Sequence, residues 1–221
     1  FTFEFSQTDA ASFIREQIVP RTGVSDFLVG YDHTFGKDRS GNETLIAELG
    51  KELGYTSEVV PPLMIDDKKI SSTQIRRALQ SGVLDNANFM LGYEYSLDGI
   101  VVEGDGRGRH LGYPTANVES MDINKMLPRY GVYLVSSVIE GQLVFGMANI
   151  GTRPTFTDDT HPRLEVNYFD VNPYLYDRKL TVTFHAFIRP EMKFESVDMF
   201  WSQLRDDRDM CEDIIAGRNA G

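Results

Sequence analysis

The sequence predicts an α/β segment, followed by an antiparallel β-barrel and a C-terminal helix. Up to about Gly92, apolar residues at helical spacing alternate with short apolar runs, whereas after Tyr93 the apolar period falls to two. The first pattern is typical of βαβ units with a parallel sheet, and the second is typical of short strands that close into a barrel. We therefore expect two domains, residues 1–92 and residues 93–221.

In the first region, five elements follow from the periodicity. Asn42 can cap the start of the second helix and Gly54 can end it, because an amide side chain accepts from free N–H groups and glycine tolerates positive φ. The expected elements are a helix over residues 8–18, a strand over Asp26–Gly30, a helix over residues 45–53, a strand over residues 55–60 and a helix over residues 72–79.

In the second region, apolar residues alternate with polar ones between Gly, Pro, Asp and Asn residues, which predicts short strands. Five strands are expected, over residues 97–102, 132–139, 143–149, 164–169 and 180–187. An apolar face from Val197 to Ile215 then predicts a final helix, with Ser196 near its start and Gly217 just past its end.

Composition narrows the functional classes. The 221 residues carry 22 Lys and Arg against 33 Asp and Glu, a net charge of −11, which disfavours nonspecific nucleic-acid binding. Cys211 is the single cysteine, so an intramolecular disulfide is excluded, and no apolar run is long enough to span a bilayer. We expect a cytoplasmic protein that acts on small molecules, with no membrane partner. Nothing in the sequence indicates an oligomeric state.

The chain begins without Met. Phe1, Phe3 and Phe5 form an apolar alternation at the very start. We expect the chain to be part of a longer polypeptide.

A glycine-rich stretch, residues 104–117, separates two apolar runs. Glycines let backbone N–H groups converge on an anion, and arginines add forked donors. Ordinary hairpin loops can have the same composition, so the stretch alone does not establish a phosphate site. The candidate phosphate-binding residues are Gly104, Gly106, Arg107, Gly108, Arg109 and Gly112.

The same stretch ends in Pro114-Thr-Ala-Asn117. Thr115 and Asn117 offer neutral oxygens, which are suitable ligands for a hard cation such as Mg²⁺. Pro114 restricts the backbone just before them. A phosphate cradle beside a magnesium site indicates a nucleotide-binding function.

A kinase that acts on an alcohol also needs a carboxylate to orient the hydroxyl and accept its proton. Glu165 lies between the apolar residues Leu164 and Val166, on the opposite face of a predicted strand. A strand glutamate is more commonly a solvated surface residue. Asp105 and Asp170 are the competing carboxylates.

Residues 93–215 resemble the riboflavin kinase module of the bacterial bifunctional riboflavin kinase/FAD synthetase family. The resemblance implies that Pro114, Thr115 and Asn117 serve Mg²⁺-ATP, and that Glu165 is the catalytic base. The substrate would be riboflavin, whose 5′-hydroxyl would attack the γ-phosphate of ATP to give FMN. Arg189 and Lys193 are expected to flank the last helix rather than to contact flavin. The motifs are residues 104–117, Arg-Pro-Thr-Phe at 153–156, Leu-Glu-Val at 164–166, Tyr-Asp-Arg-Lys-Leu at 176–180 and Arg-Pro-Glu-Met-Lys-Phe at 189–194.

The first region is similar to the FMN adenylyltransferase module of the same family, an incomplete Rossmann-like nucleotidyltransferase fold here. Residues 30–36 follow a strand, and Ile-Ser-Ser-Thr-Gln-Ile-Arg at 70–76 opens a helix. Hydroxyls there can equally be helix caps, while the N-terminus of a helix can also hold phosphates. The resemblance implies nucleotide or flavin contacts from Gly30, Asp32, Phe35, Ser71, Ser72, Thr73 and Arg76.

Two departures from that module are visible. Tyr31-Asp32-His33 stands where the module usually has Glu-Asp-Phe, and the module's opening strand, with its glycine-rich turn and paired histidines, has no counterpart. We expect riboflavin kinase activity in this chain. We expect conversion of FMN to FAD by the full-length parent, and this conversion to be absent or badly impaired in this chain. The barrel would be a Greek-key type.

Two other functions stay open. One is a nucleotidyltransferase with a nonflavin acceptor, in which the barrel is an accessory domain. The other is a flavin-binding regulatory module without turnover.

Overall fold

The computed structural model describes residues 1–104, 113–152, 162–171 and 174–219. The chain divides into two compact units, Phe1–Ile70 and Ser71–Gly221. The first unit is an α/β segment and the second contains the barrel, which confirms the predicted fold class. The two helices between residues 72 and 91 pack within the second unit, before the expected domain boundary near residue 92.

The first unit has a parallel sheet of two strands, β1 (Asp26–Gly30) and β2 (Thr56–Val60), joined through α4 (Glu43–Leu53). Its small core contains Ile14, Val29 and Ile46. The other elements are α1 (Phe3–Ser6), α2 (Ala10–Ser12), the π-helix η1 (Phe13–Ile18), α3 (Val19–Thr22), the 3₁₀-helix η2 (Lys37–Arg39) and a hairpin of β3 (Met64–Ile65) with β4 (Lys68–Lys69).

The caps of α4 follow the prediction. The Asn42 side chain accepts a hydrogen bond from the Leu45 backbone N–H at 3.0 Å, and Gly54 has φ +80°. The single helix predicted over residues 8–18 is wrong in detail, because α2 passes into the π-helix η1 there. Pro20, which lacks an N–H donor, stands in the first turn of α3 directly after it.

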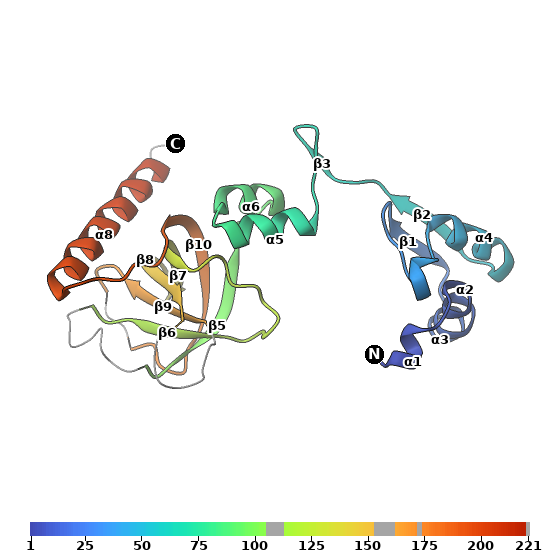
Figure 1. Ribbon diagram of the computed structural model, residues 1–221, viewed down its shortest axis with the longest axis horizontal. Coiled ribbons are helices and arrows are strands. Elements are labelled where there is room, and N and C mark those ends of the chain that lie inside the picture. Colours follow the sequence, from blue (N-terminus) through green and yellow to red (C-terminus); the bar gives the residue numbers. More distant parts are fainter. Residues whose placement is uncertain (105–112, 153–161, 172–173, 220–221) are drawn as a thin grey trace. The chain divides into compact units, whose positions relative to one another are not determined.

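The second unit contains a closed antiparallel barrel, seen at the left of Figure 1. Around the barrel the strand order is β10-β5-β6-β9-β8-β7. The strands are β5 (Ser96–Val102), β6 (Ala116–Ser120), β7 (Gly131–Ile139), β8 (Gln142–Gly151), β9 (Arg163–Tyr168) and β10 (Lys179–Arg189), and helices α5 (Ser72–Ser81) and α6 (Leu84–Leu91) precede them.

Two of these elements were not among the predictions, β6 and α6. Val118 is the one buried residue of β6, so the strand has almost no apolar alternation to detect. In α6, Leu84 and Ala87 are buried against the barrel. Neither element therefore has a hydrophobic periodicity that is clear in the sequence alone, because few of its residues are buried and those pack against the barrel.

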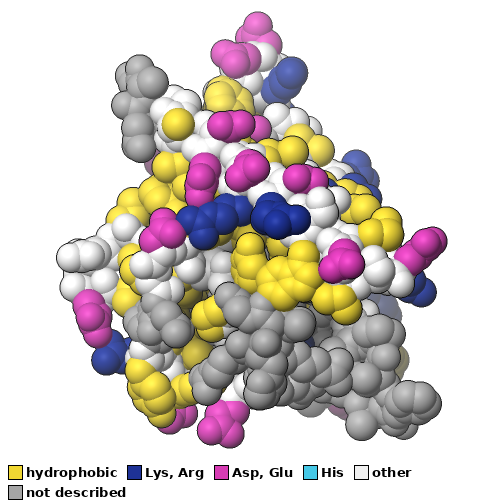
Figure 2. Space-filling view, turned by 90° about the vertical axis from the view of Figure 1, so that its left-hand side faces the viewer, with side chains coloured by type: hydrophobic (Ala, Val, Ile, Leu, Met, Phe, Trp, Pro, Cys, Tyr) yellow, Lys and Arg dark blue, Asp and Glu magenta, His cyan; other side chains and the backbone are white. Residues whose placement is uncertain are grey.

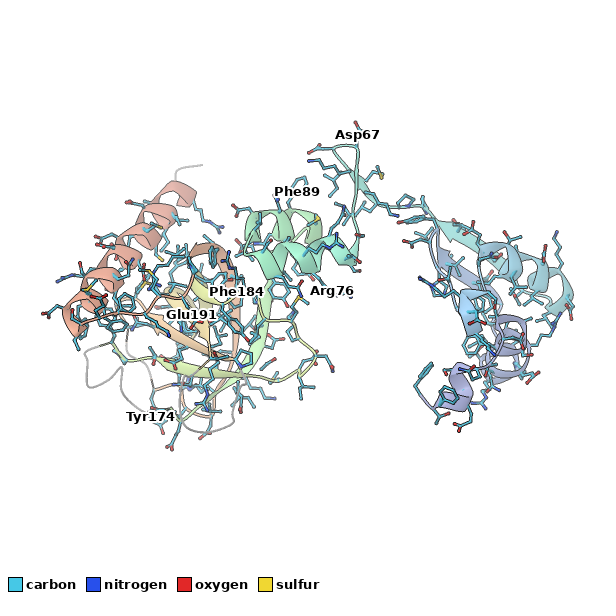
Figure 3. The ribbon with its side chains drawn as sticks, in the orientation of Figure 1. Asp67, Arg76, Phe89, Tyr174, Phe184 and Glu191 are labelled. Atoms are coloured by element: carbon cyan, nitrogen blue, oxygen red, sulfur yellow. The ribbon has the colours of Figure 1, made fainter. Side chains whose placement is uncertain are left out.

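The barrel core consists of alternate strand residues that point inward. Tyr133, Phe184 (labelled in Figure 3), Leu97, Val166 and Val182 are fully or almost fully buried. Burying a large apolar side chain contributes about 1.5–3 kcal/mol. The residues between them point outward from the barrel. Some of these, such as Leu134 and Met147, are buried in a second cluster with Cys211, and others are available to form a site.

Helix α8 (Val197–Asn219) packs on the outside of the barrel, at the left of Figure 1. Cys211 is its innermost residue, and burial raises the pKa of this thiol to about 12, so it is chemically inert at neutral pH. Figure 2 shows the face that α8 occupies, where dark blue basic side chains lie between magenta acidic ones. No helix in the described residues is long and apolar enough to cross a membrane.

The prediction that Gly217 lies just past the end of this helix is wrong, because α8 continues to Asn219. Arg218 fixes the last turn to the barrel. Its guanidinium donates to the Glu94 carboxylate at 2.7 Å and to the His185 backbone carbonyl at 3.1 Å. These tertiary contacts extend the helix through a glycine that would otherwise favour its end.

Candidate active site

Five strands of the barrel bring the central candidate residues into one row. Cross-strand partners connect Asn117 to Glu165, Glu165 to Asn149, Asn149 to Val132, and Val132 to Arg189. Neighbouring strands lie about 4.8 Å apart, so Glu165 and Arg189 are about 14 Å apart along the sheet. The row therefore places a carboxylate and a guanidinium at opposite ends of one surface.

This surface is the outer face of the barrel. Val166 and Leu164, which flank Glu165, are buried in the core, whereas Glu165 itself is half-buried. Directly paired residues of an antiparallel sheet point to the same face. Glu165 thus shares its face with Asn117 and Asn149, as the predicted alternation requires.

A pocket of about 440 Å³ lies over the part of this row from Glu165 to Arg189. Thr115 and Glu165 line one part of it, and Glu191 (labelled in Figure 3) also belongs to its wall. Most of the remaining wall is apolar or aromatic. It consists of Val132, Met147, Ala148, Met192, Phe194, Phe200 and Leu204, with Tyr113, Asn149, Asn167 and Arg189 completing the lining.

Asn117 has a neighbour that must be glycine. A Cβ atom added to Gly104 would lie 2.1 Å from Asn117 Nδ2, so any larger residue would displace the amide. Asn117 Oδ1 is buried and has no hydrogen-bond partner within the described residues. A buried acceptor left unpaired costs about 1–3 kcal/mol, so this oxygen is suited to an external donor or cation.

Asn117 does not line this first pocket but lines a second one, of about 810 Å³. The charged residues that line the second pocket are Glu103, Glu119, Asp122, Lys125 and Arg163. Two cavities therefore lie next to each other at β6. Thr115 and Glu165 line the first cavity, and Asn117 lines the second.

Metal binding at this site would depend on neutral oxygens. The described residues contain no group of three or more His, Cys, Asp or Glu that could hold a metal ion. Thr115 and Asn117 are two residues apart on β6 and its approach, so they lie on one face of that segment. A hydroxyl, an amide oxygen and the oxygens of a bound phosphate form a donor set that Mg²⁺ accepts.

The competing carboxylates are placed differently. Asp170 is exposed and pairs with Arg208 at 2.7 Å, and it does not line the pocket of Glu165. Asp105 lies outside the described residues, as does the Arg-Pro-Thr-Phe segment at 153–156. Five candidate phosphate ligands also lie outside them and stay predictions: Gly106, Arg107, Gly108, Arg109 and Gly112.

The sequence interpretation did not identify Asn149, Asn167 or Arg189 as site residues. Asn167 donates from Nδ2 to the Pro114 carbonyl at 2.8 Å, and this hydrogen bond anchors the Pro-Thr-Ala-Asn segment to β9. Arg189 was expected only to flank the last helix; it does bond to α8, but it also lines the pocket. Asn167 could have been predicted, because it lies two residues after Glu165 and so on the same face of the strand. Nothing in the sequence near Arg189 indicates the pocket, because β10 is remote in sequence from the other site residues.

In the first unit, Gly30 is the last residue of β1 and its carbonyl accepts from the His33 N–H at 2.9 Å. Asp32 forms an ion pair with Lys69 at 3.7 Å. The Phe35 ring packs so tightly on Gly41 that an added Cβ there would lie 2.6 Å from it. These contacts are structural, and a ligand role for Gly30, Asp32 and Phe35 stays a prediction.

The remaining candidates open α5, in the second unit. Ser71 is the N-cap of α5, where its Oγ accepts from the Gln74 N–H at 3.3 Å. Ser72, Thr73 and Arg76 are exposed in the first turns. Ser71 therefore has the capping role that competed with phosphate binding in the sequence interpretation.

Comparison with known families gives a consistent answer. The riboflavin kinase family model matches residues 91–215, and the FAD synthetase model matches residues 1–74. The chain belongs to the riboflavin kinase family. The first match covers the whole barrel and most of α8, and the predicted resemblance to this family is confirmed.

Curated relatives agree with this family. A bifunctional riboflavin kinase/FMN adenylyltransferase of Pseudomonas fluorescens is 38% identical over 207 residues, covering 94% of this chain and 66% of that protein. The protein of the same description from Bacillus subtilis is 36% identical over 211 residues, with 94% and 66% covered. This riboflavin kinase family member thus spans about two thirds of the length of these relatives.

Among solved structures, one from Streptococcus pneumoniae described as a macrolide-efflux protein matches with a TM-score of 0.78 and 35% identity. The match covers 96% of this chain and 67% of that one. The similarity extends to both units of this family member.

Proposed function

We propose that the chain is a riboflavin kinase that transfers the γ-phosphate of ATP to the 5′-hydroxyl of riboflavin and forms FMN. The observation that carries this proposal is the row from Asn117 through Glu165 to Arg189, in which Glu165 and Arg189 line one pocket and Asn117 lines a second pocket beside it. The family match supports the reaction class. Neither alternative, a nonflavin nucleotidyltransferase nor a regulatory binder, is favoured by the relatives.

The shape of the first pocket suits riboflavin. Its aromatic and aliphatic wall, with Phe194, Phe200 and Leu204, matches a planar heteroaromatic ring. Glu165 and Thr115 lie toward the other part of the row, where a hydroxylated chain would end. In this arrangement the ring lies toward Arg189 and the reacting hydroxyl lies beside Glu165.

The second pocket is proposed for ATP. Lys125 and Arg163 would bind phosphate charge there, beside the carboxylates of Glu103, Glu119 and Asp122. Asn117 of this pocket is the strand partner of Glu165, which lines the first pocket. A γ-phosphate bound near Asn117 would come close to Glu165, because these two residues are direct partners across β6 and β9. The meeting of two pockets at one residue pair is what transfer between two substrates requires.

In the reaction, Glu165 would accept the proton of the 5′-hydroxyl as that oxygen forms its bond to the γ-phosphorus. The bond between that phosphorus and the bridging oxygen of ADP breaks at the same time, and ADP leaves with the electron pair. A carboxylate is a weak base, so Glu165 chiefly orients the hydroxyl and takes the proton late.

Mg²⁺ would be held by the Thr115 hydroxyl and the Asn117 amide oxygen. When bound, it would neutralise charge on the phosphate oxygens. The unpaired Asn117 Oδ1 supports this assignment, and Gly104 leaves the amide free to approach. The Asn167 hydrogen bond to Pro114 would hold the segment in place during the reaction.

The decisive test is to incubate the chain with riboflavin, ATP and Mg²⁺ and to separate the flavins by chromatography. FMN is expected from the unchanged chain. In Glu165→Gln, turnover should fall by about 10²–10⁴-fold with ATP binding retained, since the general base is removed. Near-normal turnover in that variant would remove Glu165 from the mechanism.

Asp98→Asn is the matched control. Asp98 is an exposed strand carboxylate that accepts from Thr181 Oγ1 at 2.6 Å and lines neither pocket. Its variant should keep kinase turnover within about twofold, because a surface substitution away from the site changes little. Equal losses in both variants would indicate a general effect of removing charge from the barrel.

FMN adenylyltransferase is the second candidate function, favoured by the FAD synthetase match over residues 1–74. We propose that it resides in the first domain, residues 1–92, and that the kinase resides in residues 93–221. The test is the formation of FAD from FMN and ATP by the full-length parent, a reaction expected to be absent or badly impaired in this chain. In the parent, kinase-inactive Glu165→Gln should leave this reaction unchanged, which separates the two activities.

A further inference from the structure

We propose that Asp207, on α8, is a positioning residue that holds the Arg189 guanidinium at the ring end of the flavin pocket. The inference rests on the proposed function and adds a role for α8 in it. Asp207 lines neither pocket, and its side chain is 1% exposed. It would act on the ligand only through Arg189.

Arg189 and Asp207 are joined by hydrogen bonds from a single nitrogen and by an ion pair. Arg189 Nε donates to Asp207 Oδ1 at 2.8 Å and to Oδ2 at 3.0 Å, and Nη2 lies 2.8 Å from Oδ2. Gln203 donates from Nε2 to Oδ1 at 2.9 Å, so a second α8 residue fixes the carboxylate. These charge-assisted contacts with one buried carboxylate restrict the position of the guanidinium.

The remaining donors of Arg189 determine what it can bind. A guanidinium has five N–H bonds. Besides the bonds to Asp207, Nη1 donates to the Pro190 carbonyl at 3.0 Å, and these are its hydrogen bonds among the described residues. One N–H on Nη1 is left over, and Nη2 forms no hydrogen bond among the described residues, although it lies in the ion pair with Asp207. Arg189 also lines the pocket, so these remaining donors are suited to carbonyl oxygens on a planar ring.

The position of the pair along the row makes the effect specific. Arg189 lies three strands away from Glu165, about 14 Å along the sheet. Asp207 should therefore affect affinity for the flavin ring and leave the nucleotide end of the site unchanged. A purely structural ion pair would instead lower stability and affect both substrates together.

The test measures riboflavin affinity by the quenching of flavin fluorescence, and the KM of each substrate. In Asp207→Asn we expect riboflavin affinity to fall about tenfold, since charge-assisted hydrogen bonds orient the guanidinium. The KM for ATP should stay within about twofold. Lumiflavin, which has the ring but lacks the hydroxylated chain, should lose affinity by the same factor as riboflavin.

Glu212→Gln is the matched control. It removes another carboxylate of α8 from an arginine, Arg208, at 2.7 Å, in an exposed pair outside the pocket. Riboflavin affinity should not change in this variant. A tenfold loss here as well would show that any weakening of α8 lowers affinity, and would overturn the specific role of Asp207.

A double variant separates positioning from stability. Replacing a buried ion pair by apolar residues of similar size is often neutral for folding. Arg189→Met/Asp207→Leu should therefore fold and still bind riboflavin about tenfold more weakly. Unchanged riboflavin affinity in a folded Asp207→Asn or in this double variant would overturn the inference alone. An unchanged chain that binds no riboflavin would overturn the proposed function with it.

Discussion

The two units of this chain use β-structure in different ways. In the second unit, six strands close into a barrel, and residues 72 positions apart in sequence, Asn117 and Arg189, lie in one row on its outer face. In the first unit, two parallel strands pair only with each other, and every residue of β2 is exposed. The closed barrel therefore supplies both a core and a continuous outer surface. The core of the first unit is smaller in this chain, which spans about two thirds of the length of its relatives.

The sharpest test of this difference is core truncation. Phe184→Ala should destabilise the second unit by about 3–5 kcal/mol, because the side chain is fully buried and leaves a cavity. Leu28→Ala on β1 should change stability by less than about 0.5 kcal/mol, because Leu28 is 70% exposed. Urea unfolding followed by tryptophan fluorescence, from Trp201 in the second unit, and by circular dichroism measures both. Equal losses of stability in the two variants would contradict the expected difference between the two units.

A pair of glycines extends the comparison to function. Gly104→Ala should lower kinase turnover about tenfold or more, since its Cβ would lie 2.1 Å from the Asn117 amide and displace a proposed ligand. Gly41→Ala in the first unit creates a clash of similar kind, with the Phe35 ring at 2.6 Å. It should leave kinase turnover unchanged. FMN formation by the two variants decides whether the kinase depends on the second unit alone.

The smallest expected effect is on acid stability. Partial burial alone would raise the pKa of Glu94, but hydrogen bonds from Arg218 and His185 outweigh it and lower the pKa below its ordinary value. A lowered folded-state pKa gives stability that is present above the unfolded-state pKa and lost as pH falls through the folded-state pKa. Glu94→Gln should therefore lose stability at neutral pH, by about 1 kcal/mol at most, and flatten the acid decline.

Glu52 is the counterpart in the first unit. Its pKa is also lowered, by a hydrogen bond from Arg15, but both side chains are largely exposed. Glu52→Gln should change the pH dependence less than Glu94→Gln does. Thermal unfolding between pH 3 and pH 7 compares the two variants. A larger change in stability for Glu52→Gln would contradict the expectation that the contact of Glu94 with buried His185 contributes more to stability.

Much of the fold was accessible from local patterns. Asn42 and Gly54 mark the ends of α4, as expected from side-chain capping and positive φ. Alternation predicted five of the six barrel strands, but β6 was missed because Val118 is its one buried residue. The final helix was predicted too short, because Arg218 is held by partners that are remote in sequence.

The site divides in the same way. Thr115, Asn117 and Glu165 were identified from a short motif and from strand parity, which are local properties. Asn149 and Arg189 were not identified as site residues, because they approach Glu165 only through the register of neighbouring strands. These residues of the row could therefore not be predicted as site residues until the pairing of the barrel strands was known.

By itself, the sequence determined the family and the barrel class, because motifs and periodicity depend on residues that are close together in the chain. It also predicted the residues that we propose for phosphoryl transfer. The tertiary structure alone decided that Asn117, Glu165 and Arg189 share one row, and that Asp207 holds Arg189. Strand register and helix docking depend on the burial of a common core. No local stretch of the chain encodes them alone.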